Sequence, residues 1–284
     1  MRGIGGKSPW LVYLYLAPAV LGVGVLALGL VYLADASLHL LDRRTFLPGE
    51  DYTLANYQTL WERSVYGVVL LRSLGAAAVV TLFTLVLALP YAYALVRTSS
   101  PRVRRLLLLA LFTPFFIGQV VRAYGWLVVL GQQGLLNASL GLVGLGPVDI
   151  LYTFTAVVVG LVQYMLPFAV LMLTPALTAI PVELERASAA AGAHPWATLG
   201  LVILPLASPG LVAAGVVVFT LTLTDFAMPE ILGGGTQDFV ANAIYDGFFA
   251  VSDAGLGSAL AMVLVALGSV LVAVMLLATG RMVR

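Results

Sequence analysis

Long apolar runs recur along this chain, and they constrain its fold more than any other feature. In hydrocarbon every backbone N–H and C=O must be bonded within the structure, so a spanning helix needs about 20 apolar residues. The strands of a barrel would alternate apolar and polar positions, and these runs do not. The sequence therefore predicts an all-α membrane protein with six transmembrane helices, at roughly residues 11–34, 65–96, 106–130, 151–173, 206–232 and 256–279.

Composition agrees with a chain whose solvent is lipid. Of 284 residues, 61% are hydrophobic and 10% are charged, against about 25% charged in an ordinary soluble domain. The chain has no cysteine, which excludes disulfides and thiolate metal sites. Arg2 and Lys7 precede an apolar stretch that is too long for a signal peptide, so we expect a retained first helix. No linker marks a second domain, and residues 1–284 are expected to form a single transmembrane domain.

The charged residues predict the orientation of the spans, because Lys and Arg are retained on the cytoplasmic side of short loops. With the N-terminus inside, the cytoplasmic side holds nine of the fourteen basic residues: Arg2, Lys7, Arg97, Arg102, Arg104, Arg105, Arg186, Arg281 and Arg284. The outer connections, about 35–64, 131–150 and 233–255, are mainly acidic. Both termini are therefore expected to be cytoplasmic. Residues 135–145 are expected to form a short helix at the membrane interface.

One long cytoplasmic connection, about residues 175–205, separates the fourth and fifth runs and is called the elbow below. Pro181 suits a first helical position, and Glu183 and Glu185 would then complement the helix dipole from the first turn. Gly192 can adopt the left-handed conformation that ends a helix, and Pro195 can begin the next helix. The elbow is thus predicted to contain two short helices at an angle.

The elbow resembles the coupling loop of ATP-binding-cassette importer permeases, whose pattern is an EAA triplet, a later Gly, and then Ile-x-Leu-Pro or a close variant. The residues that match in register are Ala187, Gly192, Ile203, Leu204 and Pro205. The family's Glu falls at Arg186 and its second Ala at Ser188. Either the acid is displaced to a neighbouring Glu, or the ATPase partner presents a compensating acid. The resemblance implies an ATPase contact through Glu183, Glu185, Arg186, Ala187, Gly192, Ala193 and Pro195.

Further stretches are similar, in order and spacing, to the spermidine/putrescine branch of these permeases. They are FLPGEDYTLANYQTLW (46–61), VRAYGW (121–126), LGQQGLLN (130–137), TLTDFAMPEILGGG (222–235) and residues 242–247. The resemblance implies the type I importer permease fold in a bacterial inner membrane, forming half of a translocation path for a polyamine or a similar amine-bearing solute. It also implies a heterodimer with a second related permease, two ATPase subunits that bind ATP and Mg, and an outer solute-binding protein. We expect no cofactor in this chain and no nucleic-acid partner.

An ionisable side chain inside a membrane span is a functional candidate by default, because insertion of its charge costs a few kcal/mol. Asp225 in the fifth run has two readings: a path carboxylate that pairs with a substrate ammonium, or a hydrogen-bonded structural residue. A cation at Arg122 would repel a polyamine, so a structural role is expected there, by pairing with Asp225 or by snorkelling. The aromatic residues Tyr91, Tyr93, Tyr124, Trp126 and Tyr164 are either cation–π walls of the path or interface anchors.

Other function classes fit the sequence less well. A channel would show charge rings or a filter loop, and a secondary transporter would show internal repeats. A membrane enzyme or metal site would need clustered His, Asp or Glu, and no nucleotide-binding GxxxxGK[ST] occurs. Within the importer family, an opine, an amino acid derivative or a phosphonate is the alternative solute.

Overall fold

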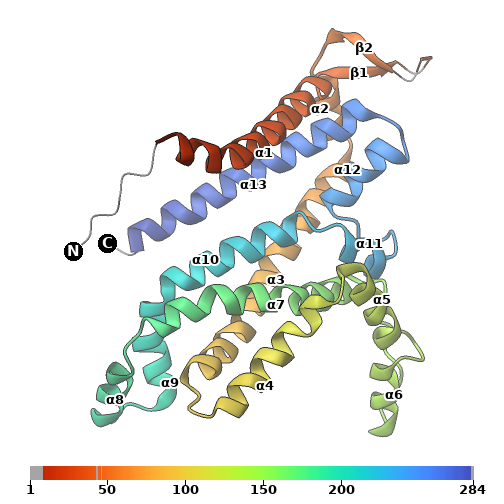
Figure 1. Ribbon diagram of the computed structural model, residues 1–284. Helices are drawn as coiled ribbons and strands as arrows, with labels where there is room; N and C mark the ends of the chain where they lie inside the picture. Colours follow the sequence, from red (N-terminus) through yellow and green to blue (C-terminus); the bar gives the residue numbers. More distant parts are fainter. Residues whose placement is uncertain (1–8, 43, 46, 283–284) are drawn as a thin grey trace. The chain divides into compact units, whose positions relative to one another are not determined.

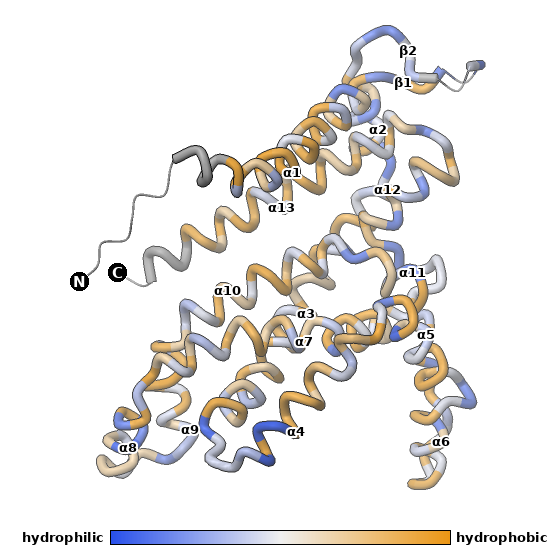
Figure 2. Tube along the Cα trace, in the orientation of Figure 1, coloured by the Kyte–Doolittle hydropathy of each residue, from blue (hydrophilic) through white to orange (hydrophobic). Residues whose placement is uncertain are grey.

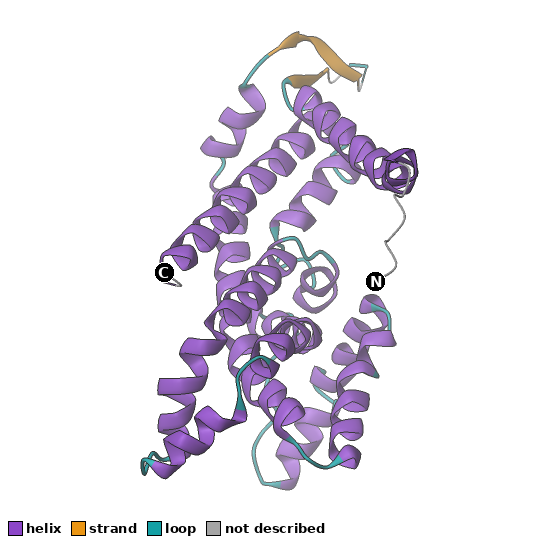
Figure 3. Cartoon of the chain, turned by 60° about the vertical axis from the view of Figure 1, so that its left-hand side comes forward, coloured by secondary structure: helices purple, strands orange, loops and turns teal. Residues whose placement is uncertain are grey.

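The computed structural model describes residues 9–42, 44–45 and 47–282, which are mostly helical (Figure 3). The first elements are α1 (Pro9–Ala36), β1 (His39–Asp42), β2 (Leu47–Tyr52), α2 (Ala55–Glu62) and α3 (Ser64–Arg97). Next come α4 (Pro101–Phe112), the 3-10 turn η1 (Pro114–Phe116), α5 (Gln119–Leu130), α6 (Leu135–Leu142) and α7 (Phe154–Thr178). The last are α8 (Val182–Ala190), α9 (Pro195–Thr198), the π turn η2 (Leu199–Ile203), α10 (Leu204–Leu223), α11 (Ala227–Gly233), α12 (Val240–Phe249) and α13 (Ala254–Met282).

Five helices in the described residues are long and apolar enough to cross a membrane, judged by length and composition. A sixth span results if the strongly bent pair formed around α4 and α5 is counted as one. The apolar stretches are the orange lengths of tube in Figure 2. The predicted all-α membrane fold is confirmed. Arg2, Lys7 and Arg284, which enter the orientation argument, lie outside the described residues.

Two of the six predicted runs are broken rather than continuous. The third run bends by 102° where α4 gives way to α5. Pro114 begins η1 inside this break, and its nitrogen has no proton with which to continue the α-helical bonding. The fifth run breaks between α10 and α11 at residues 224–226. Both breaks expose backbone groups that side chains must satisfy.

The contacts of the chain divide it into two compact units. One unit contains the described residues up to Arg63 together with Ile244–Val263, and the other contains Ser64–Ala243 together with the chain from Leu264 on. The expected single domain for the whole chain stays a prediction.

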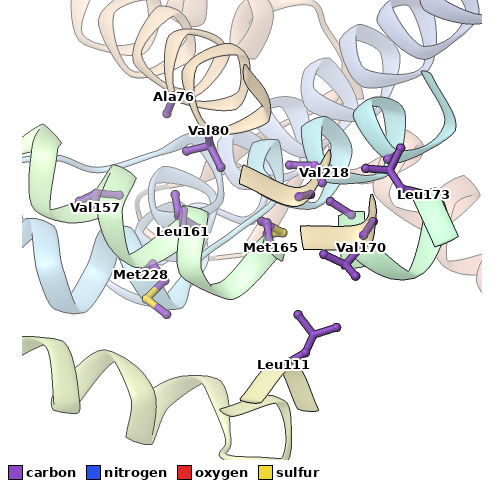
Figure 4. Close-up of a cluster of buried hydrophobic side chains, with 14 of the residues drawn as sticks. Ala76, Val80, Leu111, Val157, Leu161, Met165, Val170, Leu173, Val218 and Met228 are labelled. Carbon is purple, nitrogen blue, oxygen red and sulfur yellow. The ribbon is translucent and has the colours of Figure 1, made fainter. Parts of the chain in front are cut away.

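The larger unit is built on α3, α7 and α10, which pack against one another. Small residues permit close approach of the helices. At Gly210 in α10, an added Cβ would lie 2.4 Å from the Cβ of Ala176 in α7. Figure 4 shows the apolar side chains that fill this core, including Val80, Leu161 and Val218. The packed core holds the ends of α3, α7 and α10 in fixed positions relative to one another.

The smaller unit contains an antiparallel hairpin, β1 and β2, that the sequence analysis did not predict. Asn56 in α2 is buried and donates from its amide to the carbonyls of Ser37 and His39, which fastens α2 to the start of the hairpin. Tyr52 donates its hydroxyl to Asp35 at 3.1 Å, and this hydrogen bond with the nearby negative charge raises the pKa of Tyr52. The hairpin strands are short, so their alternation was too brief to distinguish from a loop.

Candidate functional site

The elbow forms two short helices, as the sequence predicts. α8 ends at Ala190, and Gly192 adopts φ +87°, the left-handed conformation that turns the chain. Pro195 is the first residue of α9, whereas Pro181 caps α8 from outside instead of beginning it. Figure 1 shows α8 and α9 beyond the neighbouring ends of α7 and α10.

The π turn η2 joins α9, the second helix of the elbow, to α10 without a break in the helix. The N–H of Leu204 bonds to the carbonyl of Leu199, five residues back. Pro205 follows and lacks the proton that would form the ordinary bond to a carbonyl four residues back. Residues Pro195–Leu223 are therefore one continuous helical segment. A displacement of α9 is transmitted directly to α10 by covalent and helical connection.

The predicted coupling residues differ in how exposed their side chains are. Glu183, Arg186, Ala187, Gly192 and Pro195 are exposed, and Ala193 is half-buried. The exposed members form the part of the elbow that a partner can touch.

Glu185 instead turns toward α3. Its Oε1 accepts from Arg97, at 2.7 Å from Nε and 2.6 Å from Nη2, and its Oε2 accepts from the Tyr93 hydroxyl at 2.6 Å. The hydroxyl of Ser188, at the position of the family's second Ala, lies 2.9 Å from that of Thr198, which braces α8 against α9. The acid next to Arg186 is thus engaged within the chain itself.

Asp225 lies in the break between α10 and α11 and is only 7% exposed. Its Oδ1 accepts from the backbone N–H of Met228 at 3.0 Å, and its Oδ2 accepts from the side-chain amide of Gln119 at 2.5 Å. Gln119 begins α5, so this bond joins the two broken spans. Both donors are neutral, and no cationic group of the described residues pairs with this carboxylate within 4.0 Å.

Arg122 in α5 is also buried, and it does not pair with Asp225. Its Nη2 donates to the carbonyls of Pro114 and, at 2.9 Å, of Ile117, both in the break that precedes α5. The guanidinium lies 5.1 Å from the centre of the Tyr164 ring. The structural role expected for Arg122 is therefore seen, with carbonyl groups as partners. Its Nε and Nη1 are buried without a partner among the described residues.

The aromatic residues predicted for the path do not form one wall. Tyr164 lies between Arg122 and Phe168, whose ring centre is 5.7 Å away. Trp126 donates to the Gln163 side chain at 3.4 Å, and Tyr124 is exposed. Tyr91 is engaged with α4, where its hydroxyl donates to the carbonyl of Leu107 at 2.5 Å. The role of these four residues in a path stays a prediction.

Sequence reasoning missed Gln119 and Gln163, which lie inside apolar runs and bond to Asp225 and Trp126. An uncharged amide in such a run is itself a signal, because its donors and acceptors need partners where water is scarce. Arg97 was assigned only to the orientation argument, since its pairing with Glu185 depends on tertiary structure.

Comparison with known proteins identifies the family. Residues 69–284 match the model of a family described as binding-protein-dependent transport system inner membrane component. This chain belongs to that family. It is an inner-membrane permease subunit of an ABC importer, in which a separate subunit hydrolyses ATP.

Curated relatives extend along most of this permease. It is 30% identical over 265 residues to the inner membrane ABC transporter permease protein YdcU of Escherichia coli K12, covering 88% of this chain and 84% of the relative. It is 34% identical over 215 residues to the spermidine/putrescine transport system permease protein PotB of the same organism, covering 75% of this chain and 78% of the relative. The family predicted from the elbow and the flanking stretches is confirmed.

Solved structures confirm the fold of the permease. A chain of the bacterial alginate ABC transporter, in complex with an alginate pentasaccharide-bound periplasmic protein, superposes with a TM-score of 0.78 at 18% identity. That match covers 94% of this permease and 92% of the other chain. An inward-facing structure of the MetNI methionine ABC transporter gives a TM-score of 0.57 at 22% identity, covering 80% of this permease and 97% of that chain.

Proposed function

We propose that this permease forms half of a translocation path for a small amine-bearing solute, a polyamine such as spermidine or putrescine. The observation that carries the proposal is the carboxylate of Asp225. It is buried, and its hydrogen-bond donors are neutral, so its negative charge is not balanced by a cation of the described residues. A buried charge without an opposite charge is unfavourable, and an ammonium group of a passing solute would offset that cost.

The position of Arg122 supports the same reading. Its guanidinium points to the carbonyls of the α4–α5 break, which leaves the Asp225 carboxylate for another cation. The ring of Tyr164 lies 5.1 Å from the Arg122 guanidinium, so the aromatic face already has a cation of its own. The spermidine/putrescine names of the relatives at 34% identity point to the same class of solute.

Removing the charge of Asp225 tests the proposal. In proteoliposomes that contain the complete importer, Asp225→Asn should raise the spermidine concentration for half-maximal uptake at least about tenfold, because the ammonium loses its counter-charge. Asn keeps the size of the side chain and its capacity to accept from Met228. Asp149→Asn, at an exposed carboxylate, is the control and should leave uptake unchanged. Unchanged spermidine affinity in Asp225→Asn would refute the path role of this residue.

A specific observation favours a second class of solute, one that carries a carboxylate as well as an amine. The Nε and Nη1 donors of Arg122 are buried without a partner in the described residues. An opine or another amino acid derivative would pair its carboxylate with these donors and its ammonium with Asp225. A competition experiment on solute uptake by the complete importer decides between the two classes of solute. Excess putrescine should suppress that uptake if the first proposal holds, and an excess of an amino acid derivative should suppress it if the second does.

The exposed residues of the elbow are the proposed contact with the ATPase. Four of them are Glu183, Arg186, Ala187 and Gly192. The family assignment implies a separate ATPase subunit, and that subunit must bind the permease. ATP and Mg would then be bound by that partner, present in two copies. A second, related permease would complete the path as a heterodimer, and an outer solute-binding protein would deliver the solute.

A further inference from the structure

The inner part of the elbow contains an ion pair that the proposed ATPase contact does not use. Arg97, the last residue of α3, pairs with Glu185 in α8 at 2.6 Å, and the two side chains are 19% and 13% exposed. Tyr93, one turn earlier in α3, donates to the same carboxylate. Arg97 also donates from Nη2 to the carbonyl of Ile180 at 2.8 Å, just before α8. We call this group of three side chains, Tyr93, Arg97 and Glu185, the clasp.

The clasp connects α3 to an elbow that is otherwise loosely packed against it. Between α3 and the elbow lies a pocket of about 380 Å³, lined mainly by apolar groups that include Pro90, Ala189, Trp196 and Leu199. α8 and α9 pack on each other and on the π turn. Neither α8 nor α9 packs extensively against α3. The hydrogen bonds of the clasp therefore provide the direct mechanical link from α8 to α3.

We propose that Glu185 is a positioning residue that fastens the elbow to α3, so that movement of the elbow displaces the second span together with the fifth. The proposal rests on the elbow being the ATPase contact. The elbow is already connected covalently to α7 and α10, and the clasp adds α3, the third member of the packed core. With all three helices driven together, the core moves as one body. Without the clasp, α3 lags and ATP is hydrolysed without matching transport.

The helix that follows α3 provides a matched control for Arg97. Arg102, in the first turn of α4, is an exposed arginine that the proposed ATPase contact does not include. Arg102→Gln removes an equal charge five residues further along the chain. A general effect of losing a positive charge in this region would appear in both variants, whereas an effect of the clasp appears only at Arg97.

The test measures solute uptake per ATP hydrolysed in proteoliposomes that contain the complete importer. We expect Glu185→Gln and Arg97→Gln to lower this ratio about tenfold while the ATPase subunits stay associated. The exchanged pair Arg97→Glu with Glu185→Arg should recover most of the loss, because the opposite charges again face each other. Arg102→Gln should behave as the unaltered protein. An unchanged ratio in the single variants, or an exchanged pair that is no better than either of them, would overturn the proposal.

A separate measurement distinguishes failure of the clasp from failure of the ATPase contact. The chain has no cysteine, so Ala190→Cys places a unique thiol on the exposed side of α8. It should crosslink to the ATPase through a short bifunctional maleimide–amine reagent, with or without Glu185→Gln. A crosslink together with an unchanged uptake ratio in Glu185→Gln rejects the clasp alone. Absence of the crosslink in the otherwise unaltered complex rejects the ATPase contact.

Discussion

At the scale of single residues, the turn of the elbow depends on the conformation of Gly192. Its φ of +87° is accessible to glycine and unfavourable for a residue with a Cβ, at a cost of about 1–2 kcal/mol. An added Cβ at this position would meet no atom within 4 Å. The cost of a substitution is therefore conformational and involves no steric clash. A substitution at Gly192 thus tests the backbone conformation of the turn alone.

Replacing Gly192 with alanine should weaken coupling while the permease still inserts in the membrane. The strained backbone would shift the angle between α8 and α9, and we expect uptake to fall several-fold. Gly200→Ala is the control, because Gly200 lies in the π turn without a positive φ and its Cβ would also meet no atom within 4 Å. Uptake is measured beside the amount of co-purified ATPase. Full uptake with normal ATPase association in Gly192→Ala would contradict the role given to the turn.

The residues whose structural roles were predicted correctly from the sequence are those that act through local backbone conformation. Gly192 and Pro195 act through their own backbone preferences, and both lie where they were expected. Glu185 was placed on the correct helix, but its partner Arg97 is 88 residues away and depends on how α3 packs. Asp225 was recognised as an ionisable residue inside a span, whereas its bond to Gln119, 106 residues away, was not predicted. Such long-range pairs are fixed by tertiary structure, which one sequence does not reveal.

At the scale of elements, the apolar runs were found because every span must be about 20 residues long and apolar. The breaks were not found, because composition stays apolar through them. In the third run Pro114 and Gly118 are the local signals of the break, and Arg122 compensates it by donating to two carbonyls. In the fifth run the signal is Asp225, which caps the start of α11. Broken spans thus require polar side chains, which bond to the backbone groups that the breaks leave without helical partners.

Helix α3 is tied at both ends. At the end opposite the clasp, Arg72 donates to the carbonyls of Thr236 and Asp238, at 3.1 and 3.3 Å. The hydroxyl of Ser73, one residue later, accepts from the N–H of Val240 at 2.9 Å. These three bonds fasten α3 to the connection between α11 and α12 and to the first residue of α12. The helix is therefore placed to move that connection whenever its clasped end moves.

Replacing Arg72 should release this connection without unfolding the core. Arg72→Gln removes the guanidinium that reaches the two carbonyls, while the bond from Val240 to Ser73 remains. We expect amide hydrogen exchange across residues 234–239 to accelerate about tenfold, because their carbonyls lose a donor and the segment opens more often. Exchange in α7 should not change, and Arg63→Gln serves as an exposed control. Equal exchange of the segment in Arg72→Gln and the unaltered protein would contradict the tie.

At the scale of the whole molecule, the larger unit carries both candidate sites, the elbow and the polar groups around Asp225. Helices α3, α7 and α10 run between these two sites. α7 is the most buried of the candidate spans, because 56% of its most apolar stretch is buried. A helix buried on that scale is held by its neighbours, so its two ends cannot move independently of the core. This packing is the physical basis of the proposal that a displacement of the elbow alters access to Asp225.

The mechanism requires the elbow to face the cytoplasm, and this orientation is open to a direct test. Ser99 is exposed in the connection that follows Arg97, and the clasp places that connection beside the elbow. Ser139 is exposed in α6, within the segment expected outside. The density of Arg residues after α3 favours the cytoplasmic side for Ser99, since such residues are retained there. Ser→Cys is a small change at both positions.

A membrane-impermeant maleimide should therefore label Ser139→Cys in spheroplasts and Ser99→Cys in inside-out vesicles. It should not label Ser139→Cys in inside-out vesicles or Ser99→Cys in spheroplasts. Because the unaltered chain has no cysteine, it gives no signal, and each variant reports one position. Labelling of Ser99→Cys in spheroplasts would put the elbow on the outer face. No ATPase of the cytoplasm could then reach Glu183 or Gly192, and the clasp would have no motion to transmit.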